Sequence, residues 1–79
     1  MQSSDNDRIV VAGEIITLHV EKGRMVIEGD NHVEYEFSYH HDDYVAAHGP
    51  SHVKVRGVVD SSRSSTPILL DDVEILAWY

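Results

Sequence analysis

Residues 52–60, HVKVRGVVD, constrain the fold of this chain more than any other segment. Val53, Val55 and Gly57 alternate with His52 and other more polar neighbours, and this period of two is typical of a strand with one face toward a core. A glycine inside such a strand indicates a bulge, a bend or close approach by another backbone. A valine-rich strand that bends at a glycine is what a small closed sheet needs, so the segment predicts a β-barrel.

The length limits how large that barrel can be. A chain of 79 residues forms one domain and buries only about 60% of its unfolded surface. It contains no cysteine, which excludes disulfides and thiolate metal sites. Residues 1–7 are polar and lack the features of a secretory signal, so we expect a disordered lead-in before a single domain at residues 8–79. No apolar run reaches the roughly 20 residues that span a bilayer, and we expect a cytoplasmic protein.

Three strands are expected before residue 40. Residues 8–21 predict the first strand, with Ile16, Leu18 and Val20 alternating and Gly13 marking a bulge or bend. Residues 21–23 predict a tight hairpin loop with Gly23 at positive φ, followed by a strand at residues 24–28 that directs Met25 and Ile27 inward. After a turn at residues 29–31, residues 33–39 predict the third strand. Four of its residues face the core: Val33, Tyr35, Phe37 and Tyr39.

The period changes over residues 40–48. His41, Tyr44, Val45 and His48 have the spacing of one helical face, with acidic residues in the first turn and Gly49 as the C-cap. A helix of about two turns does not persist without docking. We therefore expect it to close one end of the barrel through Tyr44 and Val45.

The last strand is expected after a flexible polar loop at residues 61–66. It begins at Pro67 and runs through two apolar stretches that Asp71 and Asp72 separate. Two consecutive aspartates break the alternation, as a bulge or a change of the neighbouring strand would. The sequence thus predicts a mainly β fold: a five-stranded OB-like barrel with one short helix between the third and fourth strands.

The chain also resembles a largely uncharacterised group of small bacterial OB-fold-like domains. The shared features are a glycine near the first strand, a short hairpin, a third strand ending in Phe, a helix closed by Gly, a V-x-V-x-G strand and an acidic-apolar final strand. The resemblance covers about residues 10–76 and implies a fold without catalytic residues. An SH3-like barrel could carry several of the same features. The residues concerned are Gly13, Lys22, Gly23, Phe37, Gly49, Val53, Lys54, Val55, Arg56, Gly57, Asp72, Val73, Glu74 and Ile75.

Histidines and aspartates near the helix are candidate metal ligands. His40 with Asp43, and His48 with His52, are feasible pairs for zinc or a related ion. A closed site would need ligands from both pairs. We favour an exposed, titratable helix end and expect no bound metal or other cofactor.

Nucleic-acid binding is suggested by the fold and opposed by the charge. OB-folds often bind single strands across the second and third strands. Here 14 acidic residues against 6 basic ones give a net charge of −8, which repels phosphates over most of the surface. The outward residues of those strands are expected to be Arg24, Val26, Glu28, Glu34, Glu36 and Ser38.

Protein binding is the function that the sequence favours. No nucleophile elbow, phosphate loop or HExxH motif indicates an enzyme. Val58, Ile15 and the C-terminal aromatic residues have no evident core position, and Trp and Tyr are enriched at interfaces. Trp78 folding back over the barrel end is the alternative. We predict a non-catalytic module that contacts an unknown protein partner through Lys54, Arg56, Val58, Trp78 and Tyr79.

Overall fold

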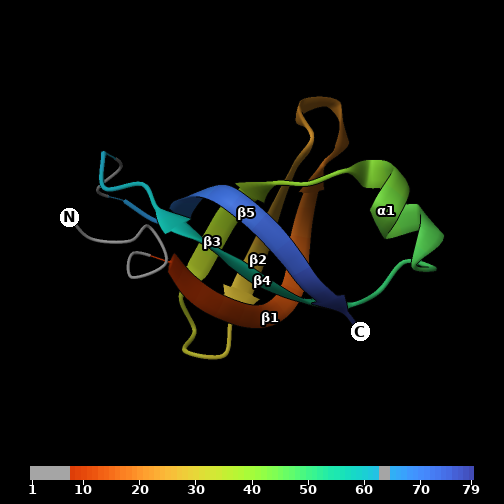
Figure 1. Cartoon of the computed structure of the whole chain (residues 1–79), viewed down its shortest axis with the longest axis horizontal. Coiled ribbons are helices and arrows are strands. Elements are labelled where there is room, and N and C mark those ends of the chain that lie inside the picture. Colours follow the sequence, from red (N-terminus) through yellow and green to blue (C-terminus); the bar gives the residue numbers. More distant parts are fainter. Residues whose placement is uncertain (1–7, 63–64) are drawn as a thin grey trace.

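Five strands form a closed barrel in the order β1-β2-β3-β5-β4 (Figure 1). The computed structural model describes residues 8–62 and 65–79. The predicted mainly β barrel with one short helix between β3 and β4 is confirmed. The prediction for residues 1–7, and part of that for the loop at residues 61–66, lies outside the described residues. The elements are β1 (Arg8–His19), the 3-10 helix η2 (Val20–Lys22), β2 (Arg24–Gly29), β3 (Glu34–Ser38), α1 (His41–Ala46), β4 (His52–Val59) and β5 (Ile68–Trp78).

One parallel pair closes the barrel. β1–β2, β2–β3, β1–β4 and β4–β5 are antiparallel, whereas β3 and β5 run parallel. The parallel pairing is short and consists of Tyr35 opposite Ile68 and Glu36 opposite Leu69. This strand order, with the helix after the third strand, is the arrangement of an OB-like barrel.

β1 pairs with two strands, and Gly13 lies in both pairings. Gly13 is opposite Gly29 on β2 and opposite Val53 on β4. A Cβ at Gly13 would lie 2.1 Å from the carbonyl oxygen of Glu28, so only glycine allows the two backbones to approach this closely. Gly13 therefore marks a close backbone contact.

The irregularity of β1 falls further along, between Ile15 and Thr17, where its pairing with β2 shifts. One extra residue in a strand switches the residues that follow it to the opposite face of the sheet. Ile15 consequently packs against the core, while Ile16 is 44% exposed. Of the three residues that alternate in the expected first strand, only Leu18 packs against the core, because Val20 belongs to η2 and is also exposed.

The core follows the predicted alternation on β2, β3 and β4. Met25 and Ile27 on β2 are buried as expected, and Val33 and Ile75 are partly buried against the cluster. Gly57 is buried opposite β5, where a Cβ would lie 2.9 Å from Cγ2 of Val73. The buried cluster contains Val11, Met25, Ile27, Tyr35, Phe37, Tyr39, Val53, Val55 and Leu70.

β5 is bulged where the two aspartates interrupt its apolar pattern. Its pairing with β4 shifts between Arg56 and Val58, and Asp72 has a φ of 55°. The predicted bulge at Asp71 and Asp72 is confirmed.

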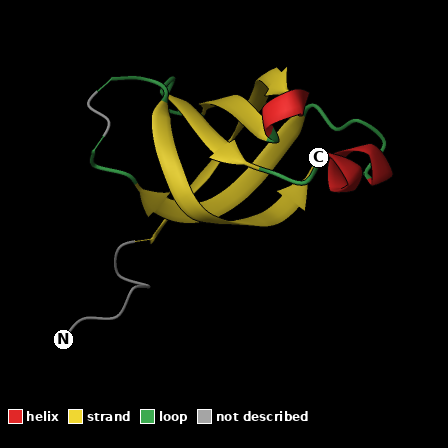
Figure 2. Ribbon diagram, turned by 90° about the horizontal axis from the view of Figure 1, so that it is seen from above, coloured by secondary structure: helices red, strands yellow, loops and turns green. Residues whose placement is uncertain are grey.

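The helix α1 is shorter than predicted and docks through one residue. Tyr44 packs against the core, whereas Val45 is 56% exposed, so the expectation that both close the barrel is wrong for Val45. Six residues form fewer than two turns, and adjacent side chains point about 100° apart. α1 lies at the end of the barrel that carries the C-terminus (Figures 1 and 2). None of the described helices is long and apolar enough to cross a membrane.

Candidate protein-binding surface

The outer side of the barrel across β1, β4 and β5 brings together several of the predicted binding residues. On β1, Val10 is opposite Arg56 and Ala12 is opposite Lys54. On the other side of β4, Arg56 is opposite Glu74 and Lys54 is opposite Ala77. Directly opposed residues point to the same face of a sheet. We call this surface the β4 face: Val10, Ala12, Lys54, Arg56, Val58, Glu74 and Ala77.

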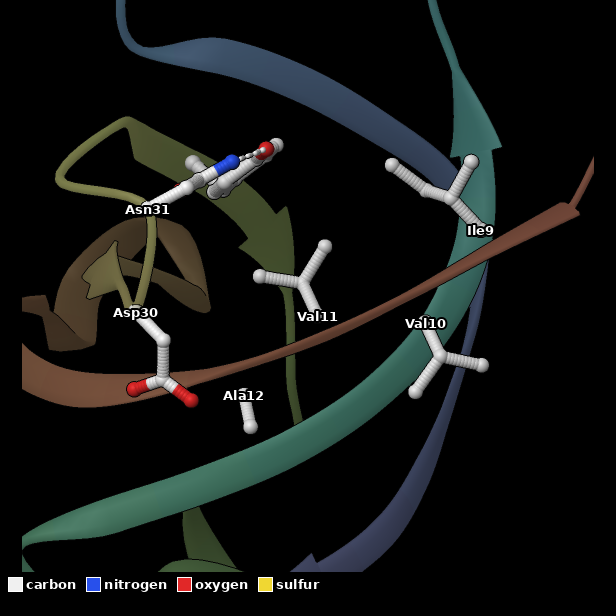
Figure 3. A pocket seen from close by; sticks show the side chains of 7 residues that line it. Ile9, Val10, Val11, Ala12, Asp30 and Asn31 are labelled. Carbon is white, nitrogen blue, oxygen red and sulfur yellow. Dashed lines mark hydrogen bonds between the residues drawn. The ribbon is translucent and has the colours of Figure 1, made fainter.

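Val10 is the most exposed apolar side chain of this face. It is 52% exposed and lines a cleft of about 550 Å³ with Arg8, Arg56 and Glu74. Val10 also lines a second cleft, of about 340 Å³ near Asn31, together with Ile9 and Val11 (Figure 3). Apolar surface with a rim of polar side chains is a feature of protein contact sites, and Val10 supplies the apolar part of this surface.

Ion pairs neutralise most of the charge on this face. A guanidinium nitrogen of Arg56 lies 3.0 Å from a carboxylate oxygen of Glu74. Arg8 donates to both the backbone carbonyl and the carboxylate of Asp72. Lys54 is exposed and has no carboxylate within 4.0 Å among residues 8–62 and 65–79. Lys54 and Arg56 therefore provide one free cation beside an internal ion pair.

The two C-terminal aromatic residues occupy different places. Trp78 is partly buried and packs against the core, in contact with Tyr44 at the barrel end. Tyr79 is 57% exposed and stacks on His52, with centroids 5.4 Å apart and planes inclined at 13°. Its backbone exchanges two hydrogen bonds with His52, at 2.7 and 3.0 Å. Trp78 thus adopts the alternative placement over the barrel end, and Tyr79 extends the β4–β5 pairing.

Sequence reasoning missed Val10 and Ala12 as members of this surface. Both lie in an apolar run with Ile9 and Val11, so the sequence did not distinguish inward from outward positions. Gly13 could have distinguished them. If Gly13 is buried, the period of two places Val11 and Ile9 inward and therefore Val10 and Ala12 outward.

The opposite side of the barrel, across β1, β2 and β3, carries a row of carboxylates. Glu28 lies directly opposite both Glu14 and Glu34. Arg24 on this side lies 4.0 Å from Glu36. Like charges placed directly opposite each other are unfavourable, so a phosphate would meet added repulsion here.

Val26 departs from the outward exposure expected on this side. It is only 7% exposed, although it points away from the barrel core. Thr17 and Glu36 lie directly on either side of it, on β1 and β3. Its apolar surface is therefore covered by neighbouring side chains.

The candidate metal ligands do not come together in a metal site. Nδ1 of His52 is 2.8 Å from the hydroxyl of Ser51. Within the described part of the chain, no three side chains of His, Cys, Asp or Glu form a group that could hold a metal ion, whether from His40, Asp43, His48, His52 or elsewhere.

Comparison with models of protein families, with curated proteins and with solved structures gives no match to this chain.

Proposed function

We propose that this chain is a cytoplasmic, non-catalytic binding module of the small bacterial OB-fold-like group, and that it acts through contacts with another protein. The β4 face makes these contacts. The observation that carries the proposal is the exposure of Val10 beside Lys54 and the Arg56–Glu74 ion pair. A central apolar residue surrounded by mixed charge matches the anatomy of non-obligate interfaces.

Lys54 and Arg56 have different roles in this proposal. Lys54 is free to attract a carboxylate of the partner and thereby to fix the orientation of the complex. Arg56 has its charge compensated by Glu74 and contributes its apolar stem to the surface around Val10. Tyr79 adds an exposed ring at the end of β4, beside His52.

Single-stranded nucleic acid is the second candidate, and the carboxylate row argues against it. The surface that OB-folds commonly use lies across β2 and β3. Here it places Glu28 against Glu34 and offers one arginine, which lies beside Glu36. Single-strand binding requires positive charge and stacking rings on the same groove.

Site-specific photocrosslinking tests the proposal. The photoreactive residue p-benzoylphenylalanine replaces Val10 in one variant and Glu34 in a matched control, and both proteins are irradiated in extract of the source cells. We expect one specific protein adduct from position 10 and none from position 34. Excess unlabelled wild-type protein should suppress the adduct, and excess Lys54→Glu protein should suppress it less. An adduct obtained equally from both positions, or only from position 34, contradicts the proposed surface.

A further inference from the structure

β3 and β5 separate after a short parallel contact. Their pairing ends at Glu36 opposite Leu69, although β3 continues to Ser38 and β5 continues to Trp78. On its other edge β5 is paired with β4 as far as Trp78. In Figure 1 the ribbons of β3 and β5 diverge toward the end of the barrel that carries α1. Beyond Leu69, the edge of β5 that faces β3 is therefore unpaired within the described residues.

A cleft occupies this opening. It has a volume of about 330 Å³ and is distinct from the β4 face. Aliphatic side chains of β5 and the end of β3 form its walls. Its lining residues are Ser38, Tyr39, His40, Leu70, Asp71, Asp72, Val73 and Ile75.

The backbone of Ser38 faces the cleft. The N–H of Tyr39 donates to the carbonyl of Gly23, at the start of β2, at 2.9 Å. Successive residues of a strand direct their backbone groups to opposite edges. The N–H and carbonyl of Ser38 consequently point toward β5, with which Ser38 makes no pairing in the described residues. An unpaired strand edge is a template for another strand.

The bulge of β5 keeps the opening from closing. Asp72 has a φ of 55°, and the β4–β5 pairing shifts around it. A bulge bends its strand and ends regular pairing locally. β5 is directed away from β3 at the point where Ser38 would otherwise find its partner.

The charge of the cleft favours a cationic occupant. Asp71 and Asp72 line it and are both exposed, and no lysine or arginine is among the lining residues. The carboxylate of Asp72 is already paired with Arg8, whereas Asp71 has no lysine or arginine within 4.0 Å among the described residues. The whole chain has a net charge of −8. Leu70, Val73 and Ile75 add apolar contact surface. A strand places successive side chains on opposite faces, so alternating basic and apolar residues would satisfy both features.

We propose that the cleft between β3 and β5 binds an extended segment of a partner protein, with alternating basic and apolar residues, as a strand added to the edge of β3. Main-chain hydrogen bonds to Ser38 hold the segment, and Asp71 selects its basic side chains. The cleft shares no lining residue with the β4 face, although Asp71 lies opposite Val58 of that face, and binding in the cleft does not depend on contacts at the β4 face.

A peptide titration followed by NMR tests this inference. The probe is a capped octapeptide of alternating lysine and valine, added to the isotope-labelled full chain. We expect saturable shifts of the amides of Ser38 and of residues 70–73. The variant Asp71→Lys should weaken binding by about tenfold or more, because like charges repel across an interface. Val10→Ser, on the β4 face, is the matched control and should leave the affinity unchanged.

Two altered peptides separate strand addition from simple charge attraction. Methylation of alternate backbone nitrogens removes the donors on one edge of the peptide while its charge remains, and it should abolish binding. Replacing every lysine of the peptide by glutamate should also abolish binding. Asp71 is exposed, and unchanged amide signals far from the cleft will show that Asp71→Lys is folded.

Several results would overturn the inference. These are the absence of saturable shifts, shifts centred on Val10 and Lys54, and equal binding of the methylated peptide. Shifts of Ser38 that depend on protein concentration without peptide would show that a second copy of the chain occupies the cleft. None of these results bears on the crosslinking at the β4 face.

Discussion

The indole ring of Trp78 meets the phenol ring of Tyr44 edge-on, with centroids 5.8 Å apart and planes inclined at 73°. Tyr44 also stacks on His41, at 5.8 Å and 24°, and meets Tyr39 edge-on at 6.3 Å. These rings connect the end of β5 to α1 and to the residue that follows β3. A helix of six residues is too short to persist alone, so this contact holds α1 on the barrel.

A double-mutant cycle measures that contact. Replacing Tyr44 and Trp78 with leucine, singly and together, should reveal a coupling free energy of about 0.5–1.5 kcal/mol, as for other aromatic pairs. Urea unfolding of the four proteins gives the value. The same cycle with Tyr44 and the exposed Tyr79 is the control and should be additive within about 0.5 kcal/mol. Additivity for Tyr44 with Trp78 would mean that the rings do not hold α1 in place.

Phe37→Ala should be among the most destabilising substitutions. Phe37 is 0% exposed at the centre of the core. Its truncation should cost about 3–5 kcal/mol in the free energy of unfolding. Ser38→Ala, at the next and exposed position, should change that free energy by no more than about 0.5 kcal/mol. Thermal and denaturant unfolding provide the measurement, and an unchanged midpoint for Phe37→Ala would contradict the inward facing of β3.

Gly13→Ala should destabilise the barrel through a backbone clash. The new Cβ would lie 2.1 Å from the carbonyl oxygen of Glu28 and 2.8 Å from Cα of Gly29. β1 and β2 would have to separate, at a cost of about 3 kcal/mol or more. Gly23→Ala is the control, because its φ of 65° is strained for alanine while the nearest atom is 3.7 Å away. It should cost only about 1–2 kcal/mol in chemical denaturation. Equal losses for the two variants would argue against the close contact at Gly13.

Stability should fall at alkaline pH partly through Tyr39. Burial raises the pKa of the Tyr39 hydroxyl above its usual value of 10.0, and the nearby hydroxyl of Tyr44 adds to this increase. Above about pH 10 the unfolded chain loses this proton while the folded chain retains it, so the folded state binds more protons. The free energy of unfolding therefore decreases as the pH rises through that range.

Tyr39→Phe isolates this contribution. The variant also loses the contact of the hydroxyl with Nδ1 of His41 and starts from a different stability at neutral pH. Its melting temperature should nevertheless decline less steeply between neutral pH and about pH 11. Parallel slopes for the variant and the wild-type protein would show that Tyr39 titrates alike in both states.

Single-stranded nucleic acid should not bind at physiological ionic strength. Glu28 lies between Glu14 and Glu34 on the surface where OB-folds commonly bind strands. Fluorescence anisotropy with a labelled mixed-sequence oligonucleotide should show no saturable change. Micromolar binding that weakens with salt and disappears in Lys54→Glu/Arg56→Glu would disprove the prediction and place the site on the β4 face.

The alternation of apolar residues predicted the fold well because the core follows it on three strands. Met25, Phe37 and Val55 are buried where a period of two places them. The irregularity in β1 was expected at Gly13 but lies between Ile15 and Thr17, because its position depends on pairing with a strand elsewhere in the chain. The exposure of Ile16 and the inward position of Ile15 follow from that shift.

The candidate surfaces were less predictable than the core. Lys54, Arg56 and Val58 were identified because they alternate with the core residues of their strand, whereas Val10 lies in an apolar run whose facing follows only once Gly13 is known to be buried. Asp71 and Asp72 indicated the bulge of β5. They did not indicate that β3 lies across from it, because the parallel pairing joins Tyr35 to Ile68, far along the chain.

β1 pairs with both β2 and β4, so a shift in its register would disturb two pairings at once. A displacement of β1 by one position would turn Val11 outward and bring Val10 and Ala12 inward against both neighbours at once. It would also move Gly13 away from the carbonyl of Glu28, where the backbone of β2 leaves no room for a side chain. Gly13 thus fixes the register of β1 against both neighbouring strands, and with it the register of the barrel.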